Sequence, residues 1–514
     1  MTERVIPIEP TGMRASDVLA VVRGQFEVEI TPAAHRAMAA SRAHVDAIAA
    51  RADPVYGVST GFGALATSQV PASRRGEAQI SLLRSHAAGM GPRVEQEVVR
   101  ATMLLRLRTL CSGITGVRPE VADVLGKLLN AHVTPLVYEF GSLGCSGDLA
   151  PLAHIALALI GEGDVEAADG SVVPAAAALS AIGVSPLVLQ EKEGLGLING
   201  TDGMLAGLAL SAEDFRKLLK IADISAAMST EALLATDVAF RPDLVGLRPQ
   251  PGQRLSAENL TRLLAGSAIV ASHRDDDSRV QDAYSIRCAP QVAGAARDTL
   301  AHVDAVVERE LLAKIDNPVV IEDGEVVSNG NFHGAPLGYA ADFLAIAAAD
   351  LASIAERRTD RMMDRTRSAG LPPFLASEPG VDSGLMIAHY TQAAMVSELK
   401  RLAVPASVDS IPTSAMQEDH VSMGWAATRK LRTAVSLLRS VLAIEILAAS
   451  RALALRAPLE PAAATGAVAN IVLDAVGRAG KPDRYVAPQL AAAAELVHDR
   501  VLIDAAESAV GTLH

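Results

Sequence analysis

The sequence Gly141-Ser-Leu-Gly-Cys-Ser-Gly-Asp-Leu-Ala-Pro-Leu-Ala-His154 joins a polar, glycine-rich loop to the start of a helix. Three glycines lie within its first seven residues, and glycine at this density is typical of backbone that turns tightly or approaches another group closely. Asp148-Leu-Ala-Pro151 has the pattern of a helix start, with a short acidic residue before the helix and proline in its first turn. We therefore expect a loop held at the positive end of a helix.

Long apolar segments surround this loop, and their spacing predicts helices. From Glu95 to Cys111, apolar residues recur at helical spacing and arginines occupy other faces, which predicts an amphipathic helix. Between Thr433 and Leu455 only three charged residues interrupt an apolar run, so we expect a helix that is covered on nearly every side. The segments 203–222 and 340–358 have the same character. Long helices are therefore expected to fill most of the chain after residue 200.

The composition favours a mainly α-helical protein. Hydrophobic residues make up 50% of the 514 residues and aromatic residues only 3%, while alanine and leucine dominate long stretches. This is typical of closely packed helices with small side chains between them. Regular strands are expected to be scarce, and the best candidates are Val5–Ile8, Phe26–Ile30 and Val319–Val327, the last with a turn at Asp323-Gly324.

The charge and the cysteine pattern exclude several classes of protein. The net charge is -13 and no basic tract offsets it, so nucleic acid is not an expected partner. Three cysteines spread widely along the chain favour a reducing compartment over a disulfide framework or a cysteine-rich zinc site. Residues 1–12 lack the apolar core of a signal peptide. We therefore expect a cytoplasmic protein.

Residues Gly170–Gln190 form the longest uncharged stretch, which raises the question of a membrane span. Two prolines and Gly183 interrupt this stretch, and its many alanines dilute its hydropathy. We expect a soluble connection followed by a buried segment, and no membrane as a partner.

Polar segments that contain glycine interrupt the helical pattern, and their composition does not serve packing. They are Tyr56–Gly63, Gly141–Pro151, Gly196–Gly203 and Ser328–His333, with further polar stretches at 281–287 and 417–420. Taken one at a time, such loops are more often turns than sites. They are nevertheless where we expect the chemistry of the protein.

Familiar site patterns do not fit these segments. Gly57–Gly63 has the order G-x-x-x-G-x-G with no Lys-Ser/Thr after it, which matches neither a phosphate loop nor a dinucleotide-binding turn. Ser146 lies between glycines, but a hydrolase elbow needs glycine where Asp148 stands, so hydrolysis is a weaker alternative. The acidic run in His273–Asp277 is more typical of solvated surface than of a metal site, and we expect no metal.

Over its whole length, the segment Gly141–His154 resembles the signature of the histidine and phenylalanine ammonia-lyase family. In that family an Ala-Ser-Gly tripeptide cyclises without help into 4-methylideneimidazol-5-one (MIO), an electrophilic ring. The matching residues here are Cys145, Ser146 and Gly147. The resemblance therefore implies a prosthetic group built from the chain itself, with no external cofactor.

The residue types meet the physical demands of this cyclisation. The amide nitrogen of Gly147 has to reach the carbonyl carbon of Cys145, which needs the conformational freedom and small profile of glycine. Ser146 then loses its hydroxyl as water and becomes the methylidene carbon. Cys145 replaces the commoner alanine, but only its carbonyl enters the ring, so we expect cysteine to be tolerated. The helix start at Asp148 would favour electron density flowing into the ring.

The resemblance extends over nearly the whole chain and implies roles for the other polar segments. Asn199 matches an asparagine that hydrogen-bonds the ring and the substrate. Tyr56 matches a catalytic loop tyrosine, which we expect to act as the base with its pKa lowered by an electropositive site. Arg287 would hold the substrate carboxylate through a planar two-point contact, and Tyr284 is a second candidate for proton transfer. The matches around the ring and the carboxylate are Gln281, Tyr284, Arg287 and Phe332.

Two segments separate the possible substrates. Ser85-His86 and Gln417-Glu418 resemble the histidine enzymes of the family, whereas the phenylalanine enzymes carry uncharged residues in the first segment. An imidazole needs a hydrogen-bonding partner at each nitrogen, and His86 and Glu418 can supply them. We therefore expect deamination of L-histidine to trans-urocanate and ammonia. A tyrosine or phenylalanine ammonia-lyase, an aromatic 2,3-aminomutase and an inactive helical binding protein remain alternatives.

The resemblance also implies an architecture and an assembly. It predicts a smaller mixed N-terminal domain, residues 1–110, that carries the active-site loop. It predicts an elongated bundle of long helices, residues 111–514, that carries the self-formed cofactor. Because the family is tetrameric, with several chains contributing to each site, we expect a homotetramer that acts on a small-molecule amino acid.

Overall fold

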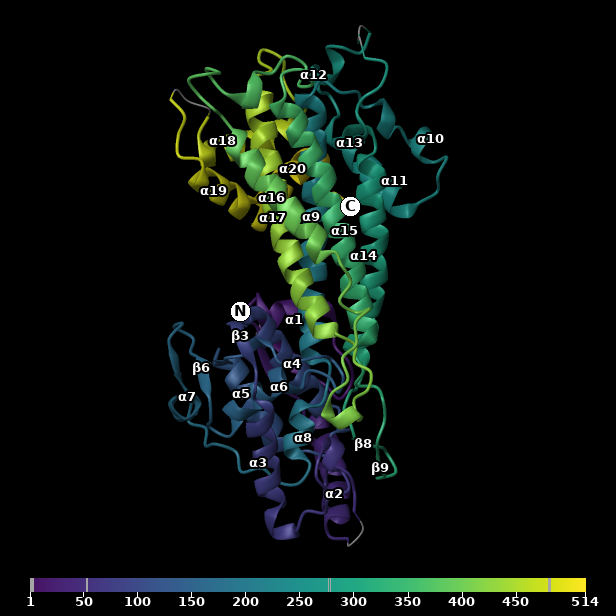
Figure 1. Ribbon diagram of the computed structural model, residues 1–514, viewed down its shortest axis with the longest axis vertical. Coiled ribbons are helices and arrows are strands. Elements are labelled where there is room, and N and C mark those ends of the chain that lie inside the picture. Colours follow the sequence, from purple (N-terminus) through teal and green to yellow (C-terminus); the bar gives the residue numbers. More distant parts are fainter. Residues whose placement is uncertain (1–3, 52–53, 276, 278, 479–481) are drawn as a thin grey trace. The chain divides into compact units, whose positions relative to one another are not determined.

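The computed structural model describes residues 4–51, 54–275, 277, 279–478 and 482–514. Its fold is mainly α-helical with few and short strands, which confirms the predicted fold class (Figure 1). The packing does not test the expected domains 1–110 and 111–514, which stay a prediction. It defines two compact units, each described here by itself: unit 1 contains Met1–Leu210, Asp304–Asp342 and Pro405–Arg429, and unit 2 contains Ser211–Val303, Phe343–Val404 and Lys430–His514.

Helices form most of both units. Unit 1 contains α1 (Ala15–Val22), α2 (Pro32–Ala49), α3 (Arg75–His86), α4 (Gln96–Cys111), α5 (Pro119–Asn130), α6 (Leu149–Leu159), α7 (Ala175–Ala181) and α8 (Glu193–Ile198). Unit 2 contains α10 (Pro242–Val245), α11 (Pro251–Leu263), α12 (Ala268–Ala271), α13 (Tyr284–Arg287), α16 (Met386–Leu402), α18 (Ala463–Val476), α19 (Ala487–His498) and α20 (Val501–Val510). The longest helices supply residues to both units: α9 (Asp202–Ala232), α14 (Ala289–Leu312), α15 (Ala335–Met363) and α17 (Gly424–Ala454). These long helices confirm the pattern predicted after residue 200.

The strands are short and lie in unit 1 as far as the structure describes the chain. A parallel pair joins β1 (Val5–Ile8) to β2 (Glu27–Ile30), and an antiparallel pair joins β3 (Met90–Arg93) to β5 (Tyr138–Phe140). Three strands form a small antiparallel sheet: β4 (Thr134–Pro135), β6 (Asp164–Glu166) and β7 (Val172–Pro174). A hairpin pairs β8 (Val319–Val320) with β9 (Val326–Val327), so the three segments expected to form strands do so. Short 3-10 helices occur at Gly63–Leu65, Ala72–Arg74, Val238–Phe240, Pro373–Leu375 and Ser414–Met416.

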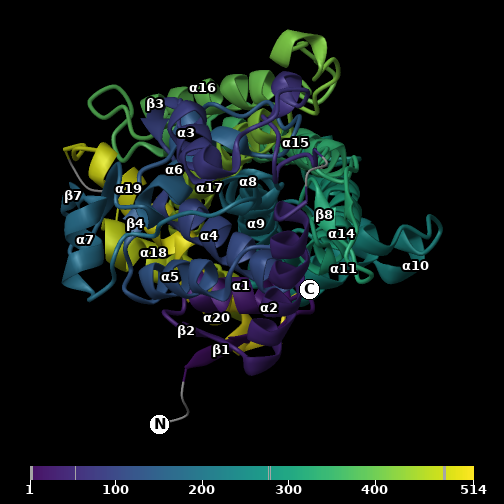
Figure 2. The same cartoon turned by 90° about the horizontal axis from the view of Figure 1, so that it is seen from below.

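Helix α4 is the central helix of unit 1: the helix expected from Glu95 to Cys111 is confirmed, but its expected amphipathic character is wrong. It contacts α1, α2, α5 and α8 (Figure 2), and every residue from Val98 to Cys111 is buried. The arginines of this helix can be buried because backbone carbonyls accept hydrogen bonds from their guanidinium groups. Arg106 donates to the carbonyl of Ile315 at 2.9 Å, and Arg108 donates to that of Leu311 at 3.0 Å. These two hydrogen bonds thus hold residues 311–315 against the core of the unit.

Among the described residues, two helices are long and apolar enough to raise the membrane question again. In Ala335–Met363 and Gly424–Ala454, 61% and 72% of the most apolar windows are buried inside the protein, which is also the pattern of core helices. The expected covering of the C-terminal half of α17 is confirmed, since residues 441–453 are buried throughout. The uncharged stretch 170–190 is divided between β7, α7 and a loop.

Candidate active site

The glycine-rich loop at residues 141–148 is shaped by two glycines that no other residue can replace without strain. Gly144 has φ 67° and a Cβ there would stand 2.3 Å from the hydroxyl of Ser422. Gly147 has φ 76° and a Cβ there would stand 2.2 Å from the carbonyl oxygen of Gly200. Both angles belong to the left-handed region, and both positions lack room for a side chain. The expectation that Gly147 needs a small profile therefore has a concrete cause, the close approach of residue 200.

Asp148 begins α6, as predicted, but its carboxylate does not cap the helix. It accepts hydrogen bonds from the backbone of Met204 at 2.8 Å and from the hydroxyl of Ser142 at 3.0 Å. The side chain is fully buried, and burial raises the pKa of Asp148 to about 7, although these hydrogen bonds oppose the shift. Asp148 therefore ties the loop before it to the start of α9.

Ser146 faces an asparagine whose orientation is fixed from the other side. The Ser146 hydroxyl donates to Oδ1 of Asn199 at 3.2 Å, and the Asn199 amide nitrogen donates to the carbonyl of Asn317 at 2.9 Å. Because the amide nitrogen is already engaged with a carbonyl, the oxygen has to face Ser146. Asn199 is only 2% exposed, so its side chain has little freedom to turn away.

Cys145 contacts the acidic residue expected to bind substrate. Its thiol donates to Oε2 of Glu418 at 3.0 Å, and the hydroxyl of Thr413 donates to the same oxygen at 3.1 Å. Burial and the neighbouring carboxylate raise the pKa of the Cys145 thiol to about 12. The thiol is therefore protonated at neutral pH and acts as a hydrogen-bond donor.

Tyr56 lies in the same site, but the expected lowering of its pKa is not found. Its hydroxyl accepts a hydrogen bond from the backbone of Gly63 at 3.2 Å. Burial raises the pKa of Tyr56, and the negative charges of Glu418 and Asp316 raise it further, while the Gly63 hydrogen bond lowers it. The prediction was wrong because burial, and after it the charges of the two carboxylates, favours the neutral phenol.

A cavity of about 570 Å³ brings these groups together. It is large enough for an amino acid substrate. The site residues expected from the sequence that line it are Tyr56, Cys145, Ser146, Phe332, Gln417 and Glu418. The cavity therefore collects residues from four separate polar segments of the sequence.

His86 does not line this cavity. It ends α3, and its Nδ1 contacts the carbonyl of Leu82 at 2.9 Å. Burial lowers the pKa of His86, while the backbone contact and the charge of Glu418 oppose that shift. The structure thus places His86 within electrostatic reach of Glu418 but shows no direct hydrogen bond between them, and its role as a substrate contact stays a prediction.

Gln281, Tyr284 and Arg287 belong to unit 2, so they are not part of the described cavity. The Arg287 guanidinium lies over the Tyr284 ring at 4.5 Å from its centroid, and Tyr284 is 71% exposed. Nε of Arg287 has no hydrogen-bond partner within the described residues. Gln281 and Tyr284 are exposed and Arg287 is half-buried, and the role of all three in the site stays a prediction.

The structure also shows polar pairs to which the sequence assigned no role. His333 and His420 line the cavity with their ring nitrogens 3.1 Å apart. Lys192 and Asp316, both fully buried, form an ion pair of 2.6 Å, and Asp316 also accepts from the backbone of Asn317 at 2.9 Å. The histidines stand within quoted polar segments, whereas nothing in the sequence pairs residues 192 and 316.

No cluster of three or more histidine, cysteine or acidic side chains placed to hold a metal occurs in the described part of the chain. The acidic run considered for a metal includes residue 276, which lies outside the described residues.

Comparison with known proteins places this site in a family. Residues 13–474 match the family described as aromatic amino acid lyase. A histidine ammonia-lyase of Streptomyces avermitilis is 61% identical over 508 residues, covering 99% of each chain. The crystal structure of histidine ammonia-lyase from Trypanosoma cruzi is 37% identical, covers 98% of this chain and 96% of that chain, and gives a TM-score of 0.90. Tyrosine aminomutase from Streptomyces globisporus is 34% identical with a TM-score of 0.92, covering 99% of this chain and 100% of that chain. This chain therefore belongs to the aromatic amino acid lyase family.

Proposed function

We propose that this carbon-nitrogen lyase removes ammonia from L-histidine and forms trans-urocanate. The observation that carries the proposal is 61% identity, along the whole chain, to relatives named histidine ammonia-lyase. The cavity is consistent with this assignment, because Tyr56, Ser146 and Glu418 line one space large enough for an amino acid. A tyrosine aminomutase shares the fold, so the fold by itself does not select the substrate.

The tripeptide 145–147 fits the precursor of an MIO ring. Gly147 has no room for a side chain, and the Ser146 hydroxyl that must leave is held by Asn199 at 3.2 Å. Once formed, the ring supplies an electrophilic carbon that makes the α-amino group of the substrate a better leaving group. Asn199, fixed by the carbonyl of Asn317, orients the groups at this position. No external cofactor is needed for this chemistry.

Tyr56 is the proposed base that takes the β-proton of the substrate. It lines the cavity, and its hydroxyl is held by the backbone of Gly63. Since burial and nearby carboxylates raise the pKa of Tyr56, the phenolate becomes available as the pH rises. Turnover is therefore expected to increase on the alkaline side of neutrality.

The substrate carboxylate is assigned to Arg287, with Tyr284 and Gln281 beside it. These residues belong to unit 2, where Tyr284 is 71% exposed and Nε of Arg287 has no partner among the described residues. The exposed Tyr284 and the half-buried Arg287, whose Nε donor is unsatisfied, are consistent with a contact from a second copy of the chain. We propose a homotetramer in which one copy supplies the cavity and another supplies the arginine, in agreement with the assembly that the family resemblance implies.

Glu418 is the proposed partner of the substrate imidazole, with Gln417 at the same wall and His86 within electrostatic reach. Two hydrogen bonds hold Oε2 of Glu418, which leaves its other carboxylate oxygen for the ligand. A phenyl ring would leave this carboxylate without a partner.

The three cysteines are free thiols, which is consistent with the cytoplasmic location that we propose.

The test is Ser146→Ala in the purified protein. Alanine has no hydroxyl to lose, so intact mass should show no dehydrated species, circular dichroism should be unchanged, and turnover of histidine should fall at least about a thousandfold. The wild type should instead weigh two water molecules less than its encoded chain and yield urocanate. Wild-type turnover in the variant would refute the ring, and a β-amino acid as the main product would establish an aminomutase.

A further inference from the structure

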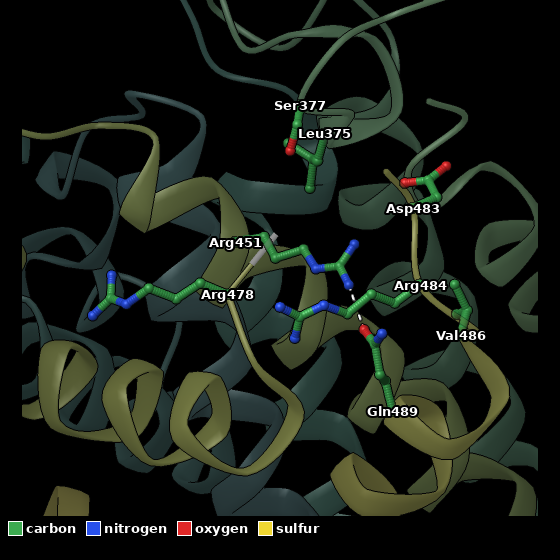
Figure 3. Close-up of a pocket in the computed structure, with 8 residues that line it drawn as sticks. All are labelled: Leu375, Ser377, Arg451, Arg478, Asp483, Arg484, Val486 and Gln489. Atoms are coloured by element: carbon green, nitrogen blue, oxygen red, sulfur yellow. Dashed lines mark hydrogen bonds between the residues drawn. The ribbon is translucent and has the colours of Figure 1, made fainter. Parts of the chain in front are cut away.

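Unit 2 contains a small recess lined by basic side chains, and the proposed function does not use it (Figure 3). Arg451 comes from α17 and Gln489 from α19, while Arg478, Asp483 and Arg484 lie between α18 and α19. Three of these five residues are cations and one is an anion. The lining therefore carries an excess of positive charge, in a chain whose net charge is -13.

Arg451 is the buried member of the group. It is only 7% exposed, its guanidinium donates one hydrogen bond to Oε1 of Gln489, and its Nε has no partner within the described residues. The Gln489 amide is neutral, and the charge of Asp483 acts on Arg451 without a hydrogen bond or ion pair between them in the described part of the chain. Because a buried guanidinium with unmet donors is unfavourable, the recess favours a further hydrogen-bond acceptor.

A second arginine increases this need. Figure 3 shows the guanidinium groups of Arg451 and Arg484 close to each other beside Gln489, whereas that of Arg478 points away. The guanidinium of Arg484 lies close to residue 477, the glycine after α18, where an added Cβ would stand 2.5 Å from Nη1 of Arg484. Burial lowers the pKa of Arg451, the charge of Asp483 opposes this shift, and the charge of Arg484 adds a smaller lowering. An anion between the two cations would relieve this repulsion.

Asp483 does not fill that position, although it lines the recess. Its Oδ2 accepts hydrogen bonds from the backbone of Ser383 at 2.6 Å and of Gly384 at 3.0 Å. Figure 3 shows its carboxylate directed away from the two neighbouring guanidinium groups. Asp483 therefore fastens its own loop to residues 383–384, and the space between the arginines is left to another anion.

We propose that this recess binds a small inorganic oxyanion, of the phosphate or sulfate class, between Arg451 and Arg484. Guanidinium groups bind such anions through paired hydrogen bonds, and the Ser377 hydroxyl in the lining is a further donor. The enclosed volume is about 10 Å³, which is room for roughly one water-sized group. One oxygen of the anion enters against Arg451, and the others face the exposed Arg484.

Isothermal titration calorimetry of the full-length enzyme with inorganic phosphate tests this site, in phosphate-free buffer whose ionic strength is kept constant with chloride. The wild type should show saturable binding of one phosphate per chain. Arg484→Gln should weaken it at least about tenfold and Arg451→Met should remove it, because each deletes a forked donor. The matched control is Arg254→Gln, which removes the same charge from an exposed arginine of α11. Its affinity should stay within roughly twofold of the wild type.

Three results would overturn the proposal. The first is phosphate heat no larger than that of matched chloride, and the second is unchanged affinity in Arg484→Gln. Because Arg484 is exposed, this variant is expected to fold even if Arg451→Met does not. The third is an arginine variant that binds phosphate as the wild type does but sediments as a different oligomer. That result would assign the recess to an acidic side chain of a second copy.

Discussion

The thiol of Cys145 donates a hydrogen bond to Oε2 of Glu418 across 3.0 Å. These residues lie far apart in the sequence, and both line the cavity. The thiol remains a donor at neutral pH because burial raises its pKa to about 12. The side chain of Cys145 therefore has a positioning role: it supports the carboxylate proposed to meet the substrate imidazole.

Cys145→Ala removes one of the two hydrogen bonds at this oxygen and leaves that of Thr413. We expect kcat/KM for histidine to fall by less than about tenfold, because a thiol is only a weak hydrogen-bond donor. The change should appear in KM more than in kcat, since the carboxylate is proposed to bind the imidazole. Cys145→Ser keeps a donor and should restore the wild-type KM. An unchanged KM in Cys145→Ala would show that the thiol does not position Glu418.

Gly147→Ala should prevent formation of the ring. The added Cβ would stand 2.2 Å from the carbonyl oxygen of Gly200, at a φ of 76°. Gly170→Ala is the matched control, because its φ is 82° but no atom lies within 4 Å of the added Cβ. Both variants carry backbone strain of about 1–2 kcal/mol, so only the close approach distinguishes them. Intact mass should show an unmodified chain for Gly147→Ala and a dehydrated chain for Gly170→Ala. A dehydrated Gly147→Ala chain would contradict the role of the close approach to Gly200.

Tyr56→Phe should lower kcat about 10²- to 10⁴-fold with a smaller effect on KM, because it removes a proton acceptor and little volume. The raised pKa of Tyr56 means that the protonated phenol is inactive at low pH and that kcat rises as the pH approaches this pKa. The variant should lose that alkaline rise. Steady-state kinetics between neutral and alkaline pH measure both effects. A retained alkaline rise in Tyr56→Phe would move the base to another residue, with Tyr284 the next candidate.

Glu418→Gln should lower kcat/KM for histidine by about tenfold or more, because the amide can hydrogen-bond but cannot pair ionically with an imidazolium or accept its proton. The fold should be preserved, since Thr413 and Glu418 are also joined through their backbones at 3.0 and 3.3 Å. Kinetics with histidine, together with a thermal melt, separate loss of chemistry from loss of stability. Equal kcat/KM in the variant and the wild type would remove Glu418 from the substrate site.

The helices were predictable because long apolar runs admit little besides buried helices. The burial of α4 was not predictable, because Arg106 and Arg108 look like surface residues in the sequence. Only the structure shows that the carbonyls of Ile315 and Leu311 accept hydrogen bonds from them. Local periodicity carries no information about partners roughly two hundred positions away. The same limit hid the ion pair between Lys192 and Asp316.

The contents of the cavity were predictable from matched motifs, as Tyr56, Ser146 and Glu418 show. Their electrostatics were not, because the pKa of Tyr56 depends on how deeply the phenol is buried and on carboxylates from other segments. Gly147 was expected to be glycine for its conformational freedom and small profile, and the structure adds the nearby carbonyl of Gly200. Residue types thus indicated the reaction, while the folded chain determines the environment of each group.

The most direct test of histidine as the substrate is to measure kcat/KM of the purified enzyme for L-histidine, L-tyrosine and L-phenylalanine. The products should be identified by chromatography. Histidine should be favoured at least about a hundredfold, because a phenyl ring leaves buried polar groups unpaired at roughly 1–3 kcal/mol each. The product should be trans-urocanate with free ammonia. A larger kcat/KM for tyrosine or phenylalanine would contradict the histidine assignment.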